Sequence, residues 1–203
     1  DLGQVKGTGP NQRILVADIK SAIENFTTGK ITAHKTPPGK VVALTGLRKA
    51  IAQRMMQSVN SMAQVTITTD VDMTEAVKLR ESLVAQWRKF SIRPLDLDLI
   101  IKAVAESLKD HPRLNATLTN DEIHILDHIN VGTAMAVPDG LMVPVIQQAE
   151  KQDLLSIAKE VRYFADKLRK DKLSVEDVTG ASFTITSLAN YEIDAFTPII
   201  NPP

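Results

Sequence analysis

The fold is decided by residues 129–146, which read INVGTAMAVPDGLMVPVI. Apolar side chains fill two short runs, Ile129 to Val137 and Leu141 to Ile146, on either side of the turn sequence Pro138-Asp139-Gly140. Proline and glycine favour the dihedral angles of tight turns, and short apolar runs around a turn are typical of neighbouring strands. With the strand-like runs in residues 116–126 just before it, this stretch predicts a β-meander.

Apolar residues recur three or four positions apart in four other stretches and predict helices over residues 45–57, 72–87, 97–109 and 153–169. The first helix is capped by Thr45, and its apolar face is expected to lie on a core. Val65 to Val71 alternates apolar and polar side chains, which predicts a half-buried strand, and Ser182 to Thr186 does the same. Strands and helices in this order predict an α+β layered domain.

Three parts of the chain differ in composition. Residues 1–26 contain a turn and one short apolar helix over 14–23, which is too little for an independent core. Residues 27–40 contain two glycines and two prolines without periodicity, which is typical of a linker. The main domain is expected over residues 41–203. Because the chain starts with neither methionine nor a signal peptide, we expect it to come from a longer one.

Overall composition excludes several classes of protein. The 24 basic residues balance the 24 acidic ones, so no net field favours nucleic acid. Charged residues interrupt every long apolar stretch well short of the roughly 20 residues of a membrane span, so no membrane partner is expected. With no cysteine there is no disulfide and no thiolate site. A cytoplasmic or organelle-matrix location is therefore expected.

Several blocks, in this order, resemble the acyltransferase components of 2-oxo acid dehydrogenase complexes. They are GLRKAIAQRM at 46–55, NVGTAMAV at 130–137, GLMVPV at 140–145, FTIT at 183–186 and FTPIINPP at 196–203. Residues 3–19 are similar to the second half of the peripheral subunit-binding domain that precedes this catalytic domain in the family. The first half of that small domain and the lipoyl domain before it have no counterpart here.

The resemblance implies a fold like that of chloramphenicol acetyltransferase, a two-layer domain whose mixed sheet is packed by helices. It implies transfer of an acyl group between a lipoyl thiol and coenzyme A, with acetyl, from pyruvate or acetoin, as the expected group. The lipoyl group would be carried on a domain absent from this chain. The partners would be a homotrimer building a larger core, the 2-oxo acid decarboxylase and dihydrolipoyl dehydrogenase.

The resemblance also places the chemistry. The family's hydroxyl that stabilises the transition state lies in a Thr-Ile-Ser block, which here reads Thr-Ile-Thr-Ser, so Thr186 and Ser187 are the candidates. An ordinary strand threonine at the start of a loop is the alternative. The family's base is the histidine of a His-x-x-x-Asp-Gly motif, which these 203 residues do not contain. We therefore expect this chain alone to lack acyl transfer activity. The following loop, residues 189–194, lacks the glycines usual in the family.

Arginine and the apolar turn supply the candidate binding residues. Arg48 and Arg54 offer guanidinium groups to a phosphate or carboxylate, with structural salt bridges as the alternative. Gly140 is expected to permit the turn. The wall beside it would consist of Leu141, Val143 and Pro144, with core packing as the alternative.

The four histidines match no position of the family motif. His34 lies in the linker and His111 at a helix end, while His124 and His128 flank a strand-like run. The i, i+4 spacing of that last pair suits a metal site on a helix, but the isoleucines around it indicate a strand, so no metal is expected.

Three functions remain open from the sequence. The first is an acyltransferase core in which a neighbour's or a missing histidine takes the thiol proton. The second is a non-catalytic scaffold that keeps the oligomeric platform without the base. The third is a binding domain unrelated to acyl transfer.

Overall fold

The computed structural model describes residues 5, 7–27, 39–138, 140–189 and 191–201. The chain divides into two compact units, Asp1–Ala43 (unit 1) and Leu44–Pro203 (unit 2). The predicted linker lies mostly outside the described residues, and His34 lies there too. The boundaries at residues 26 and 40 stay predictions.

Unit 1 is organised around one aspartate at the start of its helix. A short 3-10 helix, Pro10–Gln12, precedes α1, Val16–Thr27, which begins two residues later than predicted. The Asp18 carboxylate accepts hydrogen bonds from the Thr8 backbone N–H at 2.9 Å, the Thr8 hydroxyl at 2.7 Å and the Leu15 N–H at 2.8 Å. The bonds from Thr8 and Leu15 hold the pKa of Asp18 below its usual value.

Unit 2 begins with the helices α2, Gly46–Ser61; α3, Thr74–Trp87; and α4, Asp96–Asp110. A hairpin of two strands follows: β1, Ala116–Thr119, and β2, Glu122–Ile125. It continues with β3, Val131–Thr133; β4, Met135–Val137; β5, Gly140–Met142; β6, Val145–Ile146; α5, Leu154–Arg169; and β7, Phe183–Ile185. Short 3-10 helices lie at Arg88–Phe90, Pro112–Leu114, Ala149–Lys151 and Glu176–Val178.

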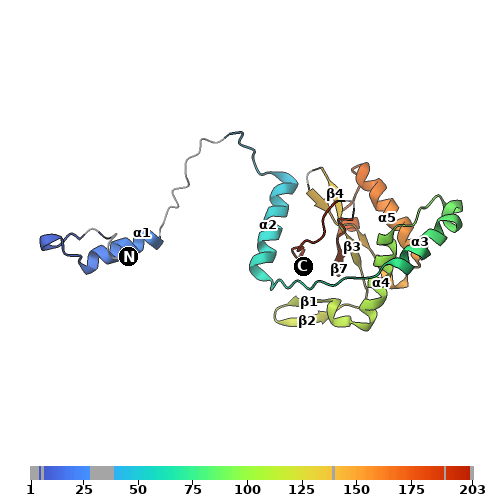
Figure 1. Ribbon diagram of the computed structural model, residues 1–203, viewed down its shortest axis with the longest axis horizontal. Helices are drawn as coiled ribbons and strands as arrows, with labels where there is room; N and C mark the ends of the chain where they lie inside the picture. The colour runs from blue at the N-terminus through green and yellow to red at the C-terminus, as the bar shows by residue number, and fades with distance from the viewer. Residues whose placement is uncertain (1–4, 6, 28–38, 139, 190, 202–203) are drawn as a thin grey trace. The chain divides into compact units, whose positions relative to one another are not determined.

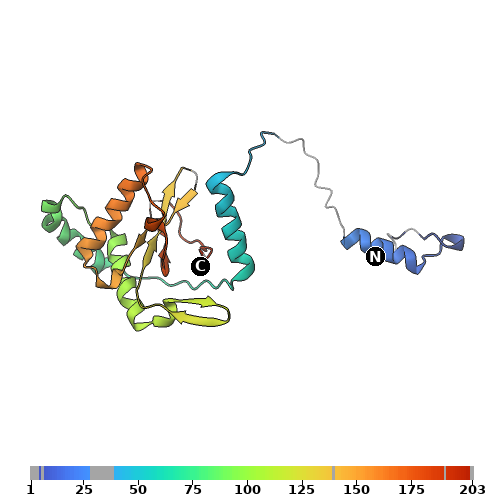
Figure 2. The same ribbon diagram turned by 180° about the vertical axis from the view of Figure 1, so that it is seen from behind.

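The central sheet is mixed. Strand β3 pairs antiparallel with β6 and parallel with β7, while β4 and β5 form a separate hairpin. The two predicted runs, 129–137 and 141–146, do pair antiparallel around the turn, as β3 with β6 and β4 with β5. The predicted continuous β-meander is wrong, because β1 and β2 form a sheet of their own and the other neighbour of β3 is β7. Helices α4 and α5 lie on one side of this sheet and α2 on the opposite side (Figure 1, Figure 2). This arrangement of helices packed on a mixed sheet confirms the predicted α+β class.

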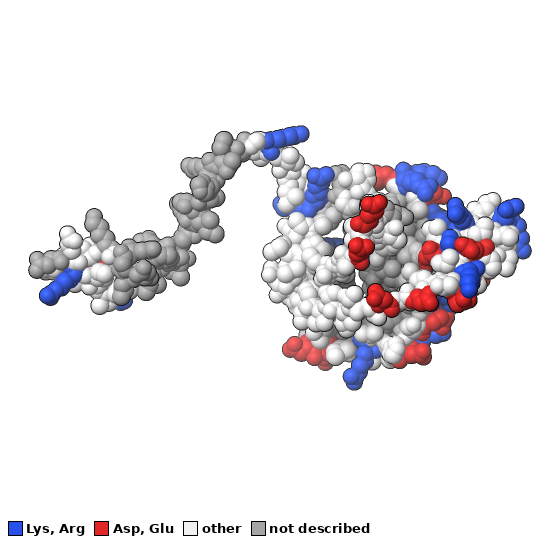
Figure 3. Space-filling model, in the orientation of Figure 1, with Lys and Arg blue, Asp and Glu red and all other residues white. Residues whose placement is uncertain are grey.

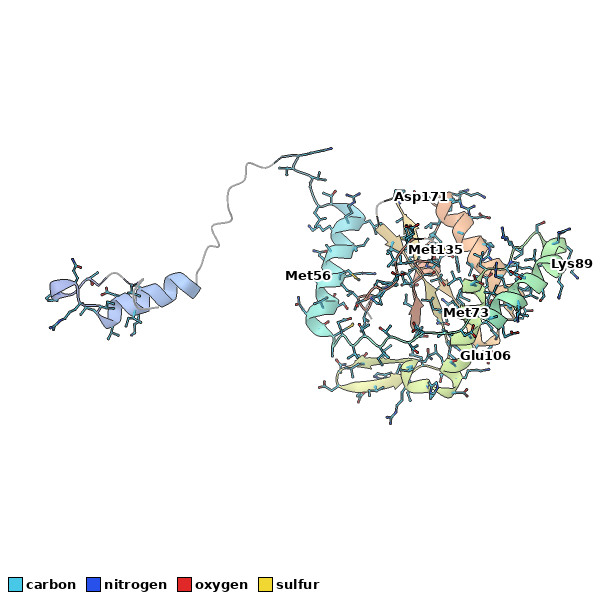
Figure 4. All side chains as sticks on the ribbon, in the orientation of Figure 1. Met56, Met73, Lys89, Glu106, Met135 and Asp171 are labelled. Atoms are coloured by element: carbon cyan, nitrogen blue, oxygen red, sulfur yellow. The ribbon has the colours of Figure 1, made fainter. Side chains whose placement is uncertain are left out.

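The core lies where α4 and α5 meet the sheet. Its fully buried members include Ile101 of α4, Val131 of β3, Ile146 of β6 and Ile157 of α5. Met135 of β4 packs against this cluster from the middle of the unit (Figure 4). Helices α4 and α5 were predicted to within about one residue, because their apolar stripes are the faces they bury.

A buried ion pair joins the two core helices. Asp98, in the first turn of α4, is 1% exposed and accepts two hydrogen bonds from Arg162 of α5, at 2.9 and 2.7 Å. The same carboxylate accepts the Leu95 N–H at 2.8 Å, and Arg162 also donates to the Arg93 carbonyl at 2.7 Å. Each charge thus keeps several partners, which a buried ion pair requires.

The other side of the sheet differs from the predictions. Residues 65–71 belong to no strand of the described chain, and Val65 and Ile67 are 81% and 89% exposed. The predicted strand is therefore wrong. The alternation predicts a strand with one buried face, but within the described chain these residues pair with no strand and their apolar side chains stay exposed. The apolar face of α2 is not on a core either: Leu47 is 41% exposed, and the buried residue of α2 is Ser58. No described helix is long and apolar enough to cross a bilayer.

Candidate functional site

Thr186 and Ser187, which we call the hydroxyl block, directly follow the carboxyl end of β7. The parallel pairing sets Gly132 beside Thr184 and Thr133 beside Ile185, and the Ala134 N–H donates to the Ile185 carbonyl at 2.9 Å. Thr186 follows at once and is half-buried. Ser187 is exposed, and its hydroxyl accepts the Ala189 N–H at 3.3 Å. The two hydroxyls therefore stand where the chain leaves the sheet.

Val143 and Pro144 lie against the same part of the sheet. A Cβ added to Gly132 would stand 2.8 Å from Cγ1 of Val143 and 3.4 Å from Oγ1 of Thr184, so only glycine lets these side chains approach. Pro144 is buried, and its carbonyl accepts the Thr133 N–H at 2.9 Å. Two of the predicted wall residues thus lie beside β3, the neighbour of the strand that leads to Thr186, although Pro144 is also part of the packed sheet.

Gly140 and Leu141 form a second group, against α2. Gly140 has φ +153°, which L side chains rarely adopt, and a Cβ there would stand 2.5 Å from Cδ1 of Ile51. The hairpin therefore needs glycine both for its backbone and for its contact with α2. Leu141 is 50% exposed.

The two arginines stand on that helix. Arg48 and Arg54 are exposed, six residues apart on α2. In the described chain, no hydrogen bond joins Arg54 to Thr186 or Ser187. The guanidinium groups accordingly belong to the α2 side of the site, and a contact with a phosphate or carboxylate stays a prediction.

The histidines do not assemble a site. His124 lies in β2, 3.6 Å from the Glu122 carboxylate, and Nδ1 of His128 is 3.9 Å from Glu150. A strand at His124 rules out the helical spacing that would suit a metal. Across the described residues, no group of three or more histidine, aspartate or glutamate side chains is placed to hold a metal ion.

An apolar pocket of about 660 Å³ lies on the α4 side of β7. Ile100 and Val104 of α4 form its floor, Phe183 and Val71 contribute walls, and Ser107 and His111 are its polar side chains. Sequence reasoning missed it, because the helical spacing of Ile100 and Val104 predicts burial rather than an open face. The pocket suits an apolar group but brings no pair of acid and base together.

The surface over α2 and the chain after β7 is mostly free of charged side chains (Figure 3). Met56 and Val59 of α2 are 61% and 48% exposed, and Phe196 and Ile199 are each 44% exposed. With Val65 and Ile67 they form what we call the open apolar face. Exposed apolar area on this scale marks interaction surfaces.

These observations give the class of this protein: an α+β domain with a mixed sheet and two hydroxyl side chains just after the end of β7. The family model for the 2-oxoacid dehydrogenases acyltransferase catalytic domain matches residues 36–203. The chain belongs to this family, which excludes a domain unrelated to acyltransferases.

Relatives and solved structures agree with this membership. The acetyltransferase component of the acetoin cleaving system of Bacillus subtilis is 34% identical over all of this chain and 51% of its own length. The succinyltransferase component of the 2-oxoglutarate dehydrogenase complex of Haemophilus influenzae is 34% identical over 98% of this chain and 52% of its own. The chain thus spans about half the length of these relatives.

A crystal structure of dihydrolipoamide acetyltransferase from Azotobacter vinelandii superposes with a TM-score of 0.80 and 32% identity, over 85% of this chain and 72% of that one. That study addresses the role of a serine, a histidine and an asparagine in its catalytic mechanism. A hydroxyl can donate a hydrogen bond to an oxyanion, and an imidazole can take the proton of a thiol.

Proposed function

We propose that the protein transfers an acyl group, acetyl in the first instance, between a dihydrolipoyl thiol and coenzyme A in the core of a 2-oxo acid dehydrogenase complex. The observation that carries the proposal is the family match over residues 36–203, with the hydroxyl block of β7 inside it. Relatives of equal identity act with acetyl and succinyl groups, so both acyl groups belong in the test.

The chemistry assigns a role to the hydroxyl block. In the proposed reaction, the coenzyme A thiolate attacks the thioester carbon, the carbonyl oxygen becomes an oxyanion, and the carbon–sulfur bond to dihydrolipoyl then breaks as that sulfur takes a proton. A hydroxyl from Thr186 or Ser187 donates to the oxyanion, which is charged only in the transition state and the intermediate. A thiol with pKa near 8.5 also needs a base. In this proposal the base comes from a histidine outside these 203 residues.

Replacing Thr186 by valine keeps the side-chain shape and removes the hydroxyl. If Thr186 is the donor, kcat falls by about 10²- to 10³-fold, as for other oxyanion donors, with KM for coenzyme A nearly unchanged. The measurement is steady-state transfer from acetyl- and succinyl-dihydrolipoamide by the assembled protein.

Thr184→Val is the matched control, because Thr184 lies two residues earlier, within β7, and its side chain is exposed. A loss in Ser187→Ala with none in Thr186→Val would move the role to Ser187. Full activity in both variants would remove the hydroxyl block from the mechanism.

Assembly is the second part of the proposal. The open apolar face supports a homotrimer that builds a larger core, because a trimer interface would cover side chains such as Met56 and Ile67. The complex would include a 2-oxo acid decarboxylase and dihydrolipoyl dehydrogenase, with unit 1 as part of a peripheral subunit-binding domain. The absence of cysteine fits a cytoplasmic or organelle-matrix location for it. Sedimentation equilibrium measures the oligomer, and a stable monomer would contradict this part.

A non-catalytic scaffold is the second candidate function. The observation that favours it is the absence of a His-x-x-x-Asp-Gly motif from these 203 residues. The transfer assay separates the two functions. Correct assembly with neither turnover nor coenzyme A binding would establish the scaffold, whereas turnover would exclude it.

A further inference from the structure

Ser58 is an unusual residue of α2. The helix exposes most of its apolar side chains, yet Ser58 is 0% exposed. A buried hydroxyl needs partners, because an unsatisfied one costs free energy. Two of its partners, Met62 and Gln64, are close by in the sequence, and the third is the Ile200 carbonyl in the chain that follows β7.

Three hydrogen bonds join Ser58, Gln64 and the backbone of Ile200 to one another. The Ser58 hydroxyl donates to the Ile200 carbonyl at 2.6 Å, and the Ile200 N–H donates to Oε1 of Gln64 at 3.3 Å. Nε2 of Gln64 then donates to Oγ of Ser58 at 3.2 Å, which closes a ring. We call this ring the Ile200 clamp. It uses both backbone groups of one residue, so it fixes a position of the chain and does not depend on the side chain there.

The clamp holds the far end of the segment that starts at the hydroxyl block. Within residues 187–201, the other described hydrogen bonds are local, such as Tyr191 N–H to the Leu188 carbonyl at 2.9 Å. The near end is fixed by β7, where the Ile185 carbonyl accepts the Ala134 N–H. In the described chain, Ile200 is therefore where hydrogen bonds tie this segment back to α2.

We propose that Ser58 and Gln64 are positioning residues for the hydroxyl block. Anchored at β7 and at Ile200, the segment between them has restricted freedom, and Thr186 and Ser187 at its start are held in a defined place. A misplacement of about 1 Å is enough to weaken a transition-state contact strongly. The inference rests on the proposed function for its consequence, but the clamp itself is testable without turnover.

The chain contains no cysteine, so a single engineered one is a unique probe. Ala189→Cys places a nitroxide label on an exposed residue two positions after Ser187. In this background, Gln64→Ala is expected to make the label more mobile by electron paramagnetic resonance. In the unlabelled protein, Gln64→Ala should raise the hydrogen-exchange rate of the Ile200 amide by about three- to tenfold. Ser58→Ala should increase the label's mobility as well.

Two variants make the test specific. Gln53→Ala removes an exposed glutamine from α2, the helix that contains Ser58, and should change neither measurement. Gln64→Glu keeps an oxygen acceptor for the Ile200 N–H but has no N–H for Ser58, so it should retain the slow exchange of Ile200 that Gln64→Ala loses. A general loosening of α2 would not be rescued in this way.

Each outcome decides the inference. If Gln64→Ala leaves the exchange of Ile200 unchanged, the clamp does not exist in solution. If exchange rises but the label at position 189 stays equally restricted, the clamp exists and does not position the hydroxyl block. Since both measurements need neither coenzyme A nor acyl transfer, a failed transfer assay would overturn the proposed function and leave the clamp standing.

Discussion

The two sides of the central sheet are held by different forces. On one side, α4 and α5 enclose an apolar core with a buried ion pair between Asp98 and Arg162. On the other side, α2 exposes its apolar residues and contacts the rest of unit 2 through Ile51 at Gly140 and through the Ile200 clamp. The first side supplies the stability of the domain. The second carries the candidate site and leaves apolar side chains exposed.

The largest expected effect comes from breaking the ion pair on the closed side. Asp98→Ala leaves the Arg162 guanidinium without its carboxylate and removes the acceptor for the Leu95 N–H. Removing one partner of a buried pair costs about 3–5 kcal/mol, so the free energy of unfolding should fall by an amount in that range. Urea unfolding followed by circular dichroism measures it.

Asp166→Ala provides the control for this variant. Asp166 pairs with Arg169 on the exposed surface of α5, at 2.9 Å, and both side chains are more than half exposed. Exposed pairs contribute about 0–1 kcal/mol. Equal losses in the two variants would show that the closed side does not depend on its buried pair.

An intermediate effect is expected where α2 meets the hairpin. Gly140→Ala forces an L side chain into φ +153° and brings its Cβ within 2.5 Å of the Ile51 position. Backbone strain of this kind costs about 1–3 kcal/mol, and the Ile51 side chain must also move, which weakens the contact between α2 and the hairpin. Limited proteolysis should therefore cut near α2 faster in the variant, while the exchange of core amides in α4 stays slow.

Gly39→Ala is the matched control, because a Cβ there would meet no atom within 4 Å. Unchanged proteolysis in Gly140→Ala would mean that α2 is held without this contact. Faster exchange throughout α4 would mean that the two sides of the sheet do not behave as separate regions.

The same contrast explains what the sequence could predict. Helices α4 and α5 follow from apolar spacing because the stripes of Ile101 and Ile157 are buried in the core. On the open side this logic fails: the alternation around Ile67 indicates a covered strand, and the structure leaves it exposed. Side chains that a partner would cover give the same local pattern as side chains covered within the chain.

Strand pairing and the clamp lie beyond local patterns. The apolar runs and the turn between them predicted neighbouring strands over residues 129–146, but not that β7 pairs with β3 in parallel. The Ser58 hydroxyl meets a carbonyl 142 residues away, and no spacing rule connects them. The place of Thr186 at the end of β7 came from the strand pattern and the family resemblance together, while its role stays a prediction.

The smallest expected effect concerns charge on the outer surface of α4. Glu106, labelled in Figure 4, pairs with Lys102 at 2.6 Å and with Lys109. Hydrogen bonds from Lys102 and then Lys109 lower the pKa of Glu106 to about 2. A lowered pKa in the folded state means that the stabilisation is complete above the ordinary value of 4.5 and is lost as the pH falls toward 2.

Glu106→Gln should therefore flatten part of the decline in stability between pH 4.5 and pH 2, measured as melting temperature against pH. The difference from the unchanged protein should be small and should shrink in high salt, because the pair is partly exposed and mobile ions screen it. Glu75→Gln is a suitable comparison, since Glu75 pairs with Lys78 in the same i, i+3 arrangement on α3 but is 85% exposed. Identical pH curves for Glu106→Gln and the unchanged protein would mean that the closed side gains its acid stability from Asp98 and the core rather than from its surface.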